Sequence, residues 1–77
     1  MRSEKEADLA KVEFGKNLRI LRETDNLKQS ELAEKLCVSQ RKISYWETEQ
    51  VEPSLEELWN IAEFFDVTID ELIGKDK

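Results

Sequence analysis

The chain has 77 residues, a formal net charge of −6, one cysteine and no histidine. A chain this short forms one small domain and buries only about 60% of the surface that it exposes when extended. Without histidine or a second cysteine we expect no metal site, cofactor, internal disulfide or enzymatic activity, and without a long apolar run we expect no membrane span.

The first predicted helix runs from about Ala7 to Asp25. The six residues before it are mostly charged, and we expect them to be disordered. Apolar side chains recur at i, i+4 and i+7 within the helix and form one stripe, made of Phe14, Leu18 and Leu21. Asn26 suits the left-handed conformation in which a helix ends, and Leu27 can pack back onto the last turn.

The second predicted helix runs from about Gln29 to Leu36. Its inward-facing residues are Leu32, Ala33 and Leu36. Lys28 occupies the cap position, where a Ser, Thr, Asp or Asn would be more favourable. Cys37 ends the helix, and Val38 supplies an apolar side chain at the turn.

The third predicted helix follows after a very short joint. Ser39 is a suitable N-cap, and the helix extends from Gln40 to about Thr48 with Ile43 and Trp46 on its inner side. Two short helices joined so tightly are typical of a unit that holds its second helix where it can enter the major groove of DNA.

Two capping boxes mark the last two predicted helices. Ser54 with Glu57 begins the fourth, after a loop from Glu49 to Pro53, and Thr68 with Glu71 begins a short fifth that ends near Gly74. The predicted core stripe of the fourth helix consists of Leu55, Leu58, Ile61, Ala62 and Phe65, with Val67 and Leu72 closing the core. The sequence therefore predicts a compact, all-α, five-helix domain over residues 1–77.

Four segments in this order resemble the lambda-repressor-like (XRE/Cro-type) helix-turn-helix family. They are FGKNLRILRE, QSELAEKL, VSQRKISYWE and PSLEELWNIAEFFDVTIDELI, which together cover roughly Phe14 to Ile73. The resemblance implies a helix-turn-helix at about residues 29–48, double-stranded DNA as a partner, and no further inducer-binding or self-cleaving domain in this chain.

The resemblance also implies roles for individual residues. Gln29 and Lys28 would contact phosphates at a helix N-terminus, Gln40 would bind adenine, and Arg41 would bind guanine or a phosphate. The DNA-binding residues predicted in this way are Lys28, Gln29, Gln40, Arg41, Lys42, Ser44, Tyr45 and Thr48. Of these, Lys42 is expected to contact the DNA backbone or solvent and not a base. The alternative is that Gln40, Arg41 and Lys42 form an ordinary solvated helix start.

Arg22 and Glu47 correspond to a partly buried ion pair in similar proteins, which would join the first helix to the third. The chain departs from the family where Cys37 and Glu49 replace common glycines. A non-glycine residue at such a turn costs about 1–2 kcal/mol, so we expect the turn at Cys37 to differ slightly. The two glutamates of the loop Glu49 to Glu52 are expected to weaken phosphate contacts.

The negative charge is concentrated in the last third of the chain. Residues 51–77 contain two Lys and eight Asp or Glu, whereas residues 16–46 contain seven basic and four acidic residues. Because screening acts over about 8 Å, this local positive charge can still favour DNA. Spare apolar residues at the acidic end predict a dimer face, made of Trp59, Phe64, Ile69 and Ile73, unless they only cover the edges of a small core.

The sequence thus predicts a DNA-binding transcriptional regulator, repressor-like and cytoplasmic, that acts as a homodimer on a palindromic operator. A bacterial, phage or mobile-element origin is expected from the resemblance. Two alternatives remain open: the antitoxin of a toxin–antitoxin pair, and a protein-interaction module of the same fold whose acidic face binds another regulator without reading DNA.

Overall fold

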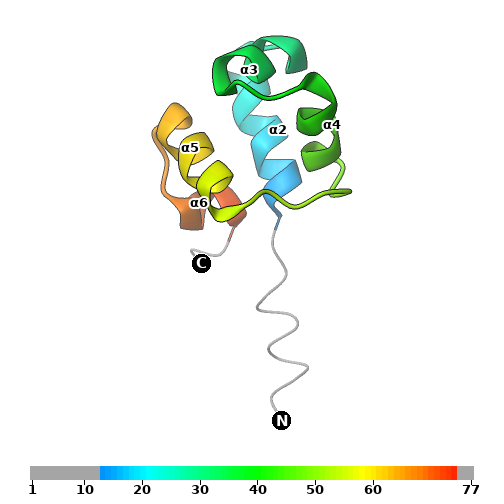
Figure 1. Cartoon of the computed structure of the whole chain (residues 1–77). Helices are drawn as coiled ribbons and strands as arrows, with labels where there is room; N and C mark the ends of the chain where they lie inside the picture. Colours follow the sequence, from blue (N-terminus) through cyan, green and yellow to red (C-terminus); the bar gives the residue numbers. More distant parts are fainter. Residues whose placement is uncertain (1–12, 75–77) are drawn as a thin grey trace.

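A computed structural model of the chain describes residues 13–74, which form five α-helices and no strand. The helices are α2 (Phe14–Thr24), α3 (Gln29–Leu36), α4 (Gln40–Glu47), α5 (Leu55–Phe65) and α6 (Ile69–Ile73). In Figure 1, α4 lies on one side of α2, while α5 and α6 lie on the other, and α3 covers the far end. The predicted all-α, five-helix fold is confirmed for this part of the chain.

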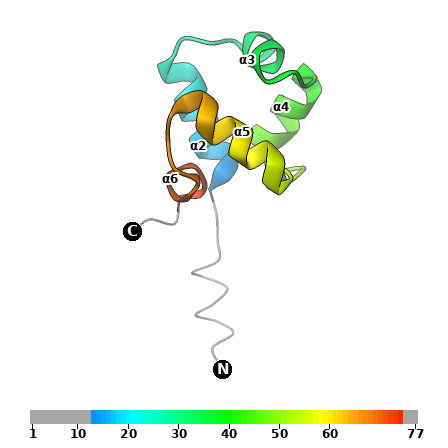
Figure 2. The same ribbon diagram turned by 60° about the vertical axis from the view of Figure 1, so that its left-hand side comes forward.

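Within the described residues, the helix predicted from Ala7 to Asp25 corresponds to α2, which runs from Phe14 to Thr24. Glu13 is the N-cap of α2 and has non-helical φ and ψ angles, and its N–H donates to the carbonyl oxygen of Ile73 at 3.0 Å. That hydrogen bond joins the start of α2 to the end of α6, which lie side by side in Figures 1 and 2. The predicted segment from Ala7 to Val12 and the six residues before it lie outside the described residues.

Helix α3 has the predicted bounds, α5 begins after Ser54 as predicted, and α4 ends at Glu47 with Thr48 as its cap. Ser39 caps α4 by accepting a hydrogen bond from the N–H of Lys42. Both predicted capping boxes are present, because Ser54 and Glu57 exchange hydrogen bonds at the start of α5, and Thr68 and Glu71 do so at α6.

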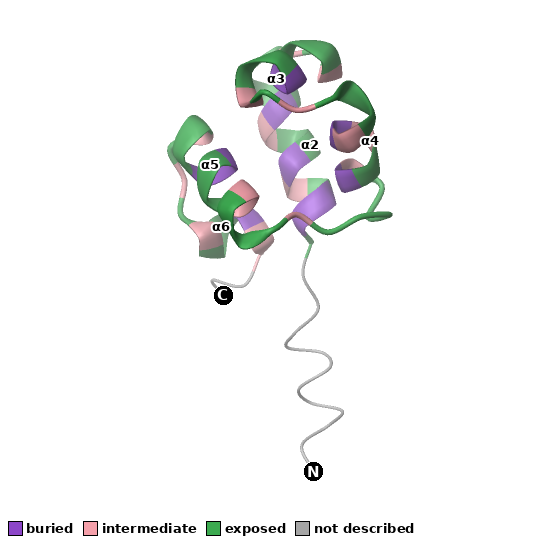
Figure 3. Ribbon diagram, in the orientation of Figure 1, coloured by how far each residue is buried: buried purple, intermediate pink, exposed green. Residues whose placement is uncertain are grey.

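The core receives buried apolar side chains from all five helices. Its members are Phe14, Leu18, Leu32, Ala33, Ile43, Trp46, Ile61, Ala62 and Leu72, and Figure 3 shows the buried positions alternating with exposed ones along each of α2 to α5. Trp46 is the largest of them, and its ring meets the ring of Phe14 edge to face with centroids 6.0 Å apart. Edge-to-face contact is a favoured arrangement of aromatic pairs.

One predicted core residue is wrong. The side chain of Leu55 is 76% exposed, although Leu58, Ile61, Ala62 and Phe65 of the same stripe contribute to the core or pack against it. Leu55 is the first residue of α5, directly after the Ser54 cap, and its side chain is exposed to solvent. No helix of residues 13–74 combines the length and the apolar character that crossing a membrane requires.

Candidate functional site

The joint between α3 and α4 has a left-handed residue at its centre. Cys37 has φ 60° and ψ 41°, its N–H donates to the carbonyl oxygen of Glu34, and the N–H of Val38 donates to that of Ala33. This is the hydrogen-bond pattern that glycine usually supports at a helix end. We expected this turn to differ slightly from the glycine-containing turn of similar proteins. That expectation is wrong, because Cys37 adopts the left-handed conformation and the usual hydrogen bonds form.

A buried ion pair joins the α3–α4 unit to α2, as the resemblance to the family implied. Arg22 binds Glu47 with both ends of its fork, from Nε to Oε2 at 2.6 Å and from Nη2 to Oε1 at 3.1 Å. The Arg22 and Glu47 side chains are only 11% and 4% exposed. The hydrogen bond to Glu47 raises the pKa of Arg22 above its ordinary value. Arg22 also donates from Nη1 to the carbonyl oxygen of Leu27 at 2.7 Å.

Gln29 belongs to the same network. Its Nε2 donates to Oε1 of Glu47 at 3.1 Å, so the amide at the start of α3 is held against the end of α4. The neighbouring Lys28 is exposed, and its backbone N–H is satisfied by the Glu31 carboxylate at 2.7 Å. The structure thus brings the predicted phosphate-contacting residues close to the C-terminal end of α4.

The outward side of α4 forms one continuous face. At 100° per residue its members span about 140° of the helix circumference, opposite the buried Ile43 and Trp46. We call it the outer face of α4, and it consists of Gln40, Arg41, Ser44, Tyr45 and Thr48. The side chains of Gln40 and Arg41 are exposed and make no hydrogen bond or ion pair to another residue within 13–74. Tyr45 is 37% exposed.

Thr48 contributes less to this face than predicted. Its hydroxyl donates to the carbonyl oxygen of Ser44 at 2.8 Å and accepts from the side-chain amide of Gln50 at 2.9 Å. To donate a hydrogen bond to DNA, the hydroxyl would first have to break its bond to the carbonyl oxygen of Ser44. The main role of Thr48 is therefore to cap the C-terminal end of α4.

Lys42 points away from the outer face of α4. Its Nζ lies 2.5 Å from Oε2 of Glu57 on α5 and 5.7 Å from the centre of the Trp46 ring. The hydrogen bond from Lys42 lowers the pKa of Glu57. The sequence placed Lys42 among the DNA-binding residues, facing the DNA backbone or solvent. The structure pairs its ammonium group with a carboxylate fifteen residues away, which the sequence did not reveal, and a DNA contact by Lys42 stays a prediction.

Glu49 has a role that the sequence did not reveal. Its backbone is left-handed, with φ 63°, and its Oε2 accepts a hydrogen bond from the N–H of Gly15 at 2.7 Å. This carboxylate therefore caps the start of α2, where the helix dipole favours a negative charge. The sequence predicted only that Glu49 and Glu52 weaken phosphate contacts. That effect stays a prediction, and the capping role of Glu49 is an addition to it.

Gly15 is required by the same contact. A Cβ atom there would lie 2.5 Å from the carbonyl oxygen of Trp46 and 2.8 Å from that of Glu47. The absence of a side chain at Gly15 allows α2 to approach the end of α4 this closely. A glycine inside an otherwise apolar-periodic helix was the only sequence signal for this contact.

The predicted dimer face does not form one surface. Trp59 and Phe64 are five residues apart on α5, so they point about 140° away from each other. Ile69 lies with Trp59 in a groove between α5 and α6, Phe64 packs against Phe65, and Ile73 lines a different hollow beside Phe14. Ile69 is also partly buried against the core, which matches the alternative that some of these residues cover its edges.

Comparisons with known proteins agree with this architecture. The model of a helix-turn-helix family, HTH_3, matches residues 18–72. The HTH-type transcriptional activator BcrR of Enterococcus faecalis is 48% identical over 63 residues, which are 82% of this chain and 31% of BcrR. This chain therefore spans about a third of the length of that relative.

Two solved structures share the fold. A transcriptional regulator from Listeria innocua has a TM-score of 0.81 and 33% identity, over 87% of this chain and 63% of its own. The P22 c2 repressor, solved in complex with a synthetic operator, has a TM-score of 0.76 and 28% identity, over 82% of this chain and 96% of its own.

Proposed function

This chain belongs to the HTH_3 helix-turn-helix family, and from that premise we propose that it is a sequence-specific DNA-binding regulator of transcription. The observation that carries the proposal is the outer face of α4. Polar and basic side chains there, above all Gln40 and Arg41, are free of partners within residues 13–74, while α4 itself is held by buried contacts. A helix presented in this way can enter a major groove without first breaking an internal interaction.

In this mechanism the start of α3 and the outer face of α4 have different roles. The start of α3, with Lys28 and Gln29, binds phosphates and sets the orientation, since phosphate contacts position a protein without reading sequence. Gln40 can bind adenine through N6 and N7, and Arg41 can bind guanine through O6 and N7. Ser44 and Tyr45, one turn further along, contact the neighbouring base pairs or the backbone.

The network around Glu47 keeps these two parts in register. Because Glu47 binds both Arg22 and the amide of Gln29, the phosphate-binding end of α3 and the outer face of α4 are fixed relative to each other. Groups whose own positions are locked by supporting hydrogen bonds lose less freedom on binding.

We further propose that the protein binds as a dimer to a palindromic operator with half-sites about 34 Å apart. Support comes from the small area that one such domain can present and from exposed apolar side chains at the start of α5. Leu55 is the most exposed of these, and Val51 in the preceding loop is 42% exposed. A bacterial setting is supported by the origin of the relatives.

Selection of bound sequences from a pool of random duplexes at physiological salt tests this function. The expected result is enrichment of a palindrome by the wild-type chain. Enrichment of single half-sites alone would contradict the dimer but leave the DNA reading intact. Weak, salt-sensitive binding without any enrichment would contradict the proposal and favour a protein-interaction module, whereas an antitoxin would enrich a site and also bind a toxin.

A further inference from the structure

A groove of about 580 Å³ opens between α5 and α6 and takes no part in the proposed reading of DNA. We call it the α5–α6 groove. Its floor is apolar and is made by Ala62, Val67 and Ile69, the Trp59 side chain forms a wall, and Glu63 and Asp66 supply carboxylates. The groove is large enough to hold several side chains of another molecule.

Trp59 is unusually exposed for its residue type. Its side chain is 58% exposed, while the other tryptophan, Trp46, is 1% exposed in the core. A tryptophan offers a large apolar area and a negatively polarised ring face, and both are enriched where proteins bind partners. The core of residues 13–74 is complete without Trp59, so its position on the groove is not explained by folding.

The charge of the groove limits what can occupy it. Glu63 and Asp66 are exposed, and neither forms an ion pair with another of the residues in the range 13–74. Two carboxylates repel the phosphates of nucleic acid. A second copy of this chain docked groove to groove would bring four carboxylates together, which is also unfavourable. A cation is favoured by the carboxylates and by the Trp59 ring together.

We propose that the α5–α6 groove binds a segment of a partner protein in which a lysine or arginine lies next to an apolar side chain. The cationic group would lie over the Trp59 ring, within reach of Glu63 and Asp66, and the apolar side chain would cover the floor at Val67 and Ile69. This combines a directional electrostatic contact with burial of apolar surface, which is how peptide grooves obtain both specificity and affinity.

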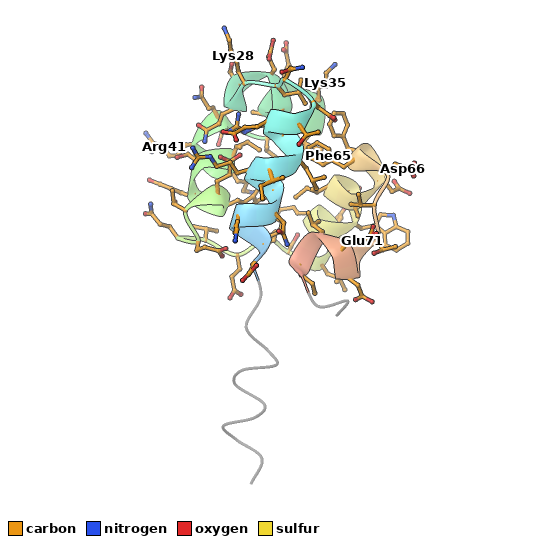
Figure 4. The ribbon with its side chains drawn as sticks, turned by 180° about the vertical axis from the view of Figure 1, so that it is seen from behind. Lys28, Lys35, Arg41, Phe65, Asp66 and Glu71 are labelled. Carbon is orange, nitrogen blue, oxygen red and sulfur yellow. The ribbon has the colours of Figure 1, made fainter. Side chains whose placement is uncertain are left out.

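The position of the groove allows the partner and DNA to bind together. Figure 4 shows Arg41 at one side of the molecule and Asp66 at the opposite side, with α2 between them. A basic segment in the groove would therefore not meet DNA held by the outer face of α4. This inference goes beyond the proposed function and does not depend on it.

A random dodecapeptide display library, selected against the full 77-residue chain at physiological salt, tests the proposal. We expect enriched peptides that carry a Lys or Arg beside an apolar residue. Binding of the synthesised peptide, measured by fluorescence anisotropy, should weaken about tenfold in Trp59→Ala and about fivefold in the double variant Glu63→Gln/Asp66→Asn. Asparagine tolerates the left-handed backbone of Asp66, so the double variant removes charge without a new turn strain.

Two variants on the same helix serve as matched controls. Phe64→Ala removes an exposed aromatic side chain outside the groove, and Glu56→Gln removes an exposed carboxylate outside it, so both should bind the peptide like the wild type. Thermal melts of every variant establish that each one folds.

Three results would overturn the proposal. The first is that no peptide is enriched, or only peptides without basic residues. The second is that the wild type and Trp59→Ala bind the peptide equally well. The third is that sedimentation shows a homodimer that Trp59→Ala dissociates. The last would make the groove an interface between copies of this chain. Operator binding is measured in parallel and is expected to be unchanged in Trp59→Ala, so failure here is separate from failure of DNA reading.

Discussion

Glu47 of α4 is bound by residues of two other helices, Arg22 of α2 and Gln29 of α3. Its carboxylate accepts hydrogen bonds from both arms of Arg22 and from Gln29, while being 4% exposed itself. Removing one partner of a buried pair leaves the other charge without compensation, which typically costs about 3–5 kcal/mol. An exposed pair contributes only about 0–1 kcal/mol.

We therefore expect Glu47→Ala to lower the melting temperature by well over 10 °C, at about 4–8 °C per kcal/mol for a domain of this size. Circular dichroism during heating measures the shift. Glu23→Ala is the control for an exposed carboxylate. Glu23 pairs with Arg19 at 3.1 Å and lies 3.9 Å from Nη2 of Arg22, but its side chain is 53% exposed, so its loss should shift the melting temperature by only a few degrees. Equal shifts in the two variants would contradict a buried pair.

At the scale of the helices, four of them end in the same way with a non-glycine residue in a left-handed conformation. These residues are Asn26, Cys37, Glu49 and Asp66, with φ angles from 58° to 63°. The N–H of the following residue bonds back to a carbonyl five positions earlier in each case, as after Cys37 and Glu49. For residues other than glycine and asparagine or aspartate, this conformation carries a cost of about 1–2 kcal/mol.

Two glycine substitutions separate backbone strain from side-chain function. Cys37→Gly should raise the free energy of unfolding by up to about 1 kcal/mol, because strain is relieved and no described contact of the side chain is lost. Glu49→Gly relieves the same strain but removes the acceptor for the Gly15 N–H, so it should be neutral or destabilising. Urea titration measures both, and equal stabilisation would show that the Glu49 cap contributes nothing.

The contact between α4 and α5 is expected to depend on pH. Lys42 and Ser54 lower the pKa of Glu57. A carboxylate with a lowered pKa in the folded state adds stability above its unfolded pKa of about 4.3, and this stability is lost as the pH falls through the folded value.

We expect Glu57→Gln to be less stable than the wild type at neutral pH. The difference should shrink below about pH 4, as Glu57 of the wild type becomes protonated. Glutamine can keep the capping contact with the Ser54 N–H, so the comparison isolates the charge. Urea titrations from acid to neutral pH measure the difference, with Glu56→Gln as the control, and a pH-independent difference would contradict this account.

The elements that could be predicted from the sequence are those specified by neighbouring residues. Ser39, Ser54 and Thr68 cap helices through residues three positions away, so the starts of α4, α5 and α6 follow from local chemistry. Features that depend on distant residues were missed, as when Lys42 binds Glu57 and Glu49 caps α2. The Arg22–Glu47 pair is equally distant, and it was predicted only because the chain resembles a family in which those positions pair.

For the whole molecule, the arrangement of the helices separates the two kinds of charge. Lys28 and Arg41 lie on the α3–α4 half, and the acidic Asp66 and Glu71 lie on the opposite side (Figure 4). A net charge of −6 therefore does not exclude binding to DNA, because Asp66 and Glu71 lie on the side of the molecule away from Arg41. This separation leaves the acidic side available to a basic protein partner.

The central claim, that the outer face of α4 reads DNA, is tested most directly by comparing two neighbouring basic residues. Affinities for the selected operator and for a scrambled duplex are measured by anisotropy at physiological salt for the wild type, Arg41→Ala and Lys42→Ala. Arg41 has no side-chain partner among residues 13–74, whereas Lys42 is held by Glu57. Arg41→Ala should therefore reduce the ratio of the two affinities about 5- to 100-fold, while Lys42→Ala leaves it nearly unchanged. An unchanged ratio in Arg41→Ala, or a larger loss in Lys42→Ala, would contradict this account.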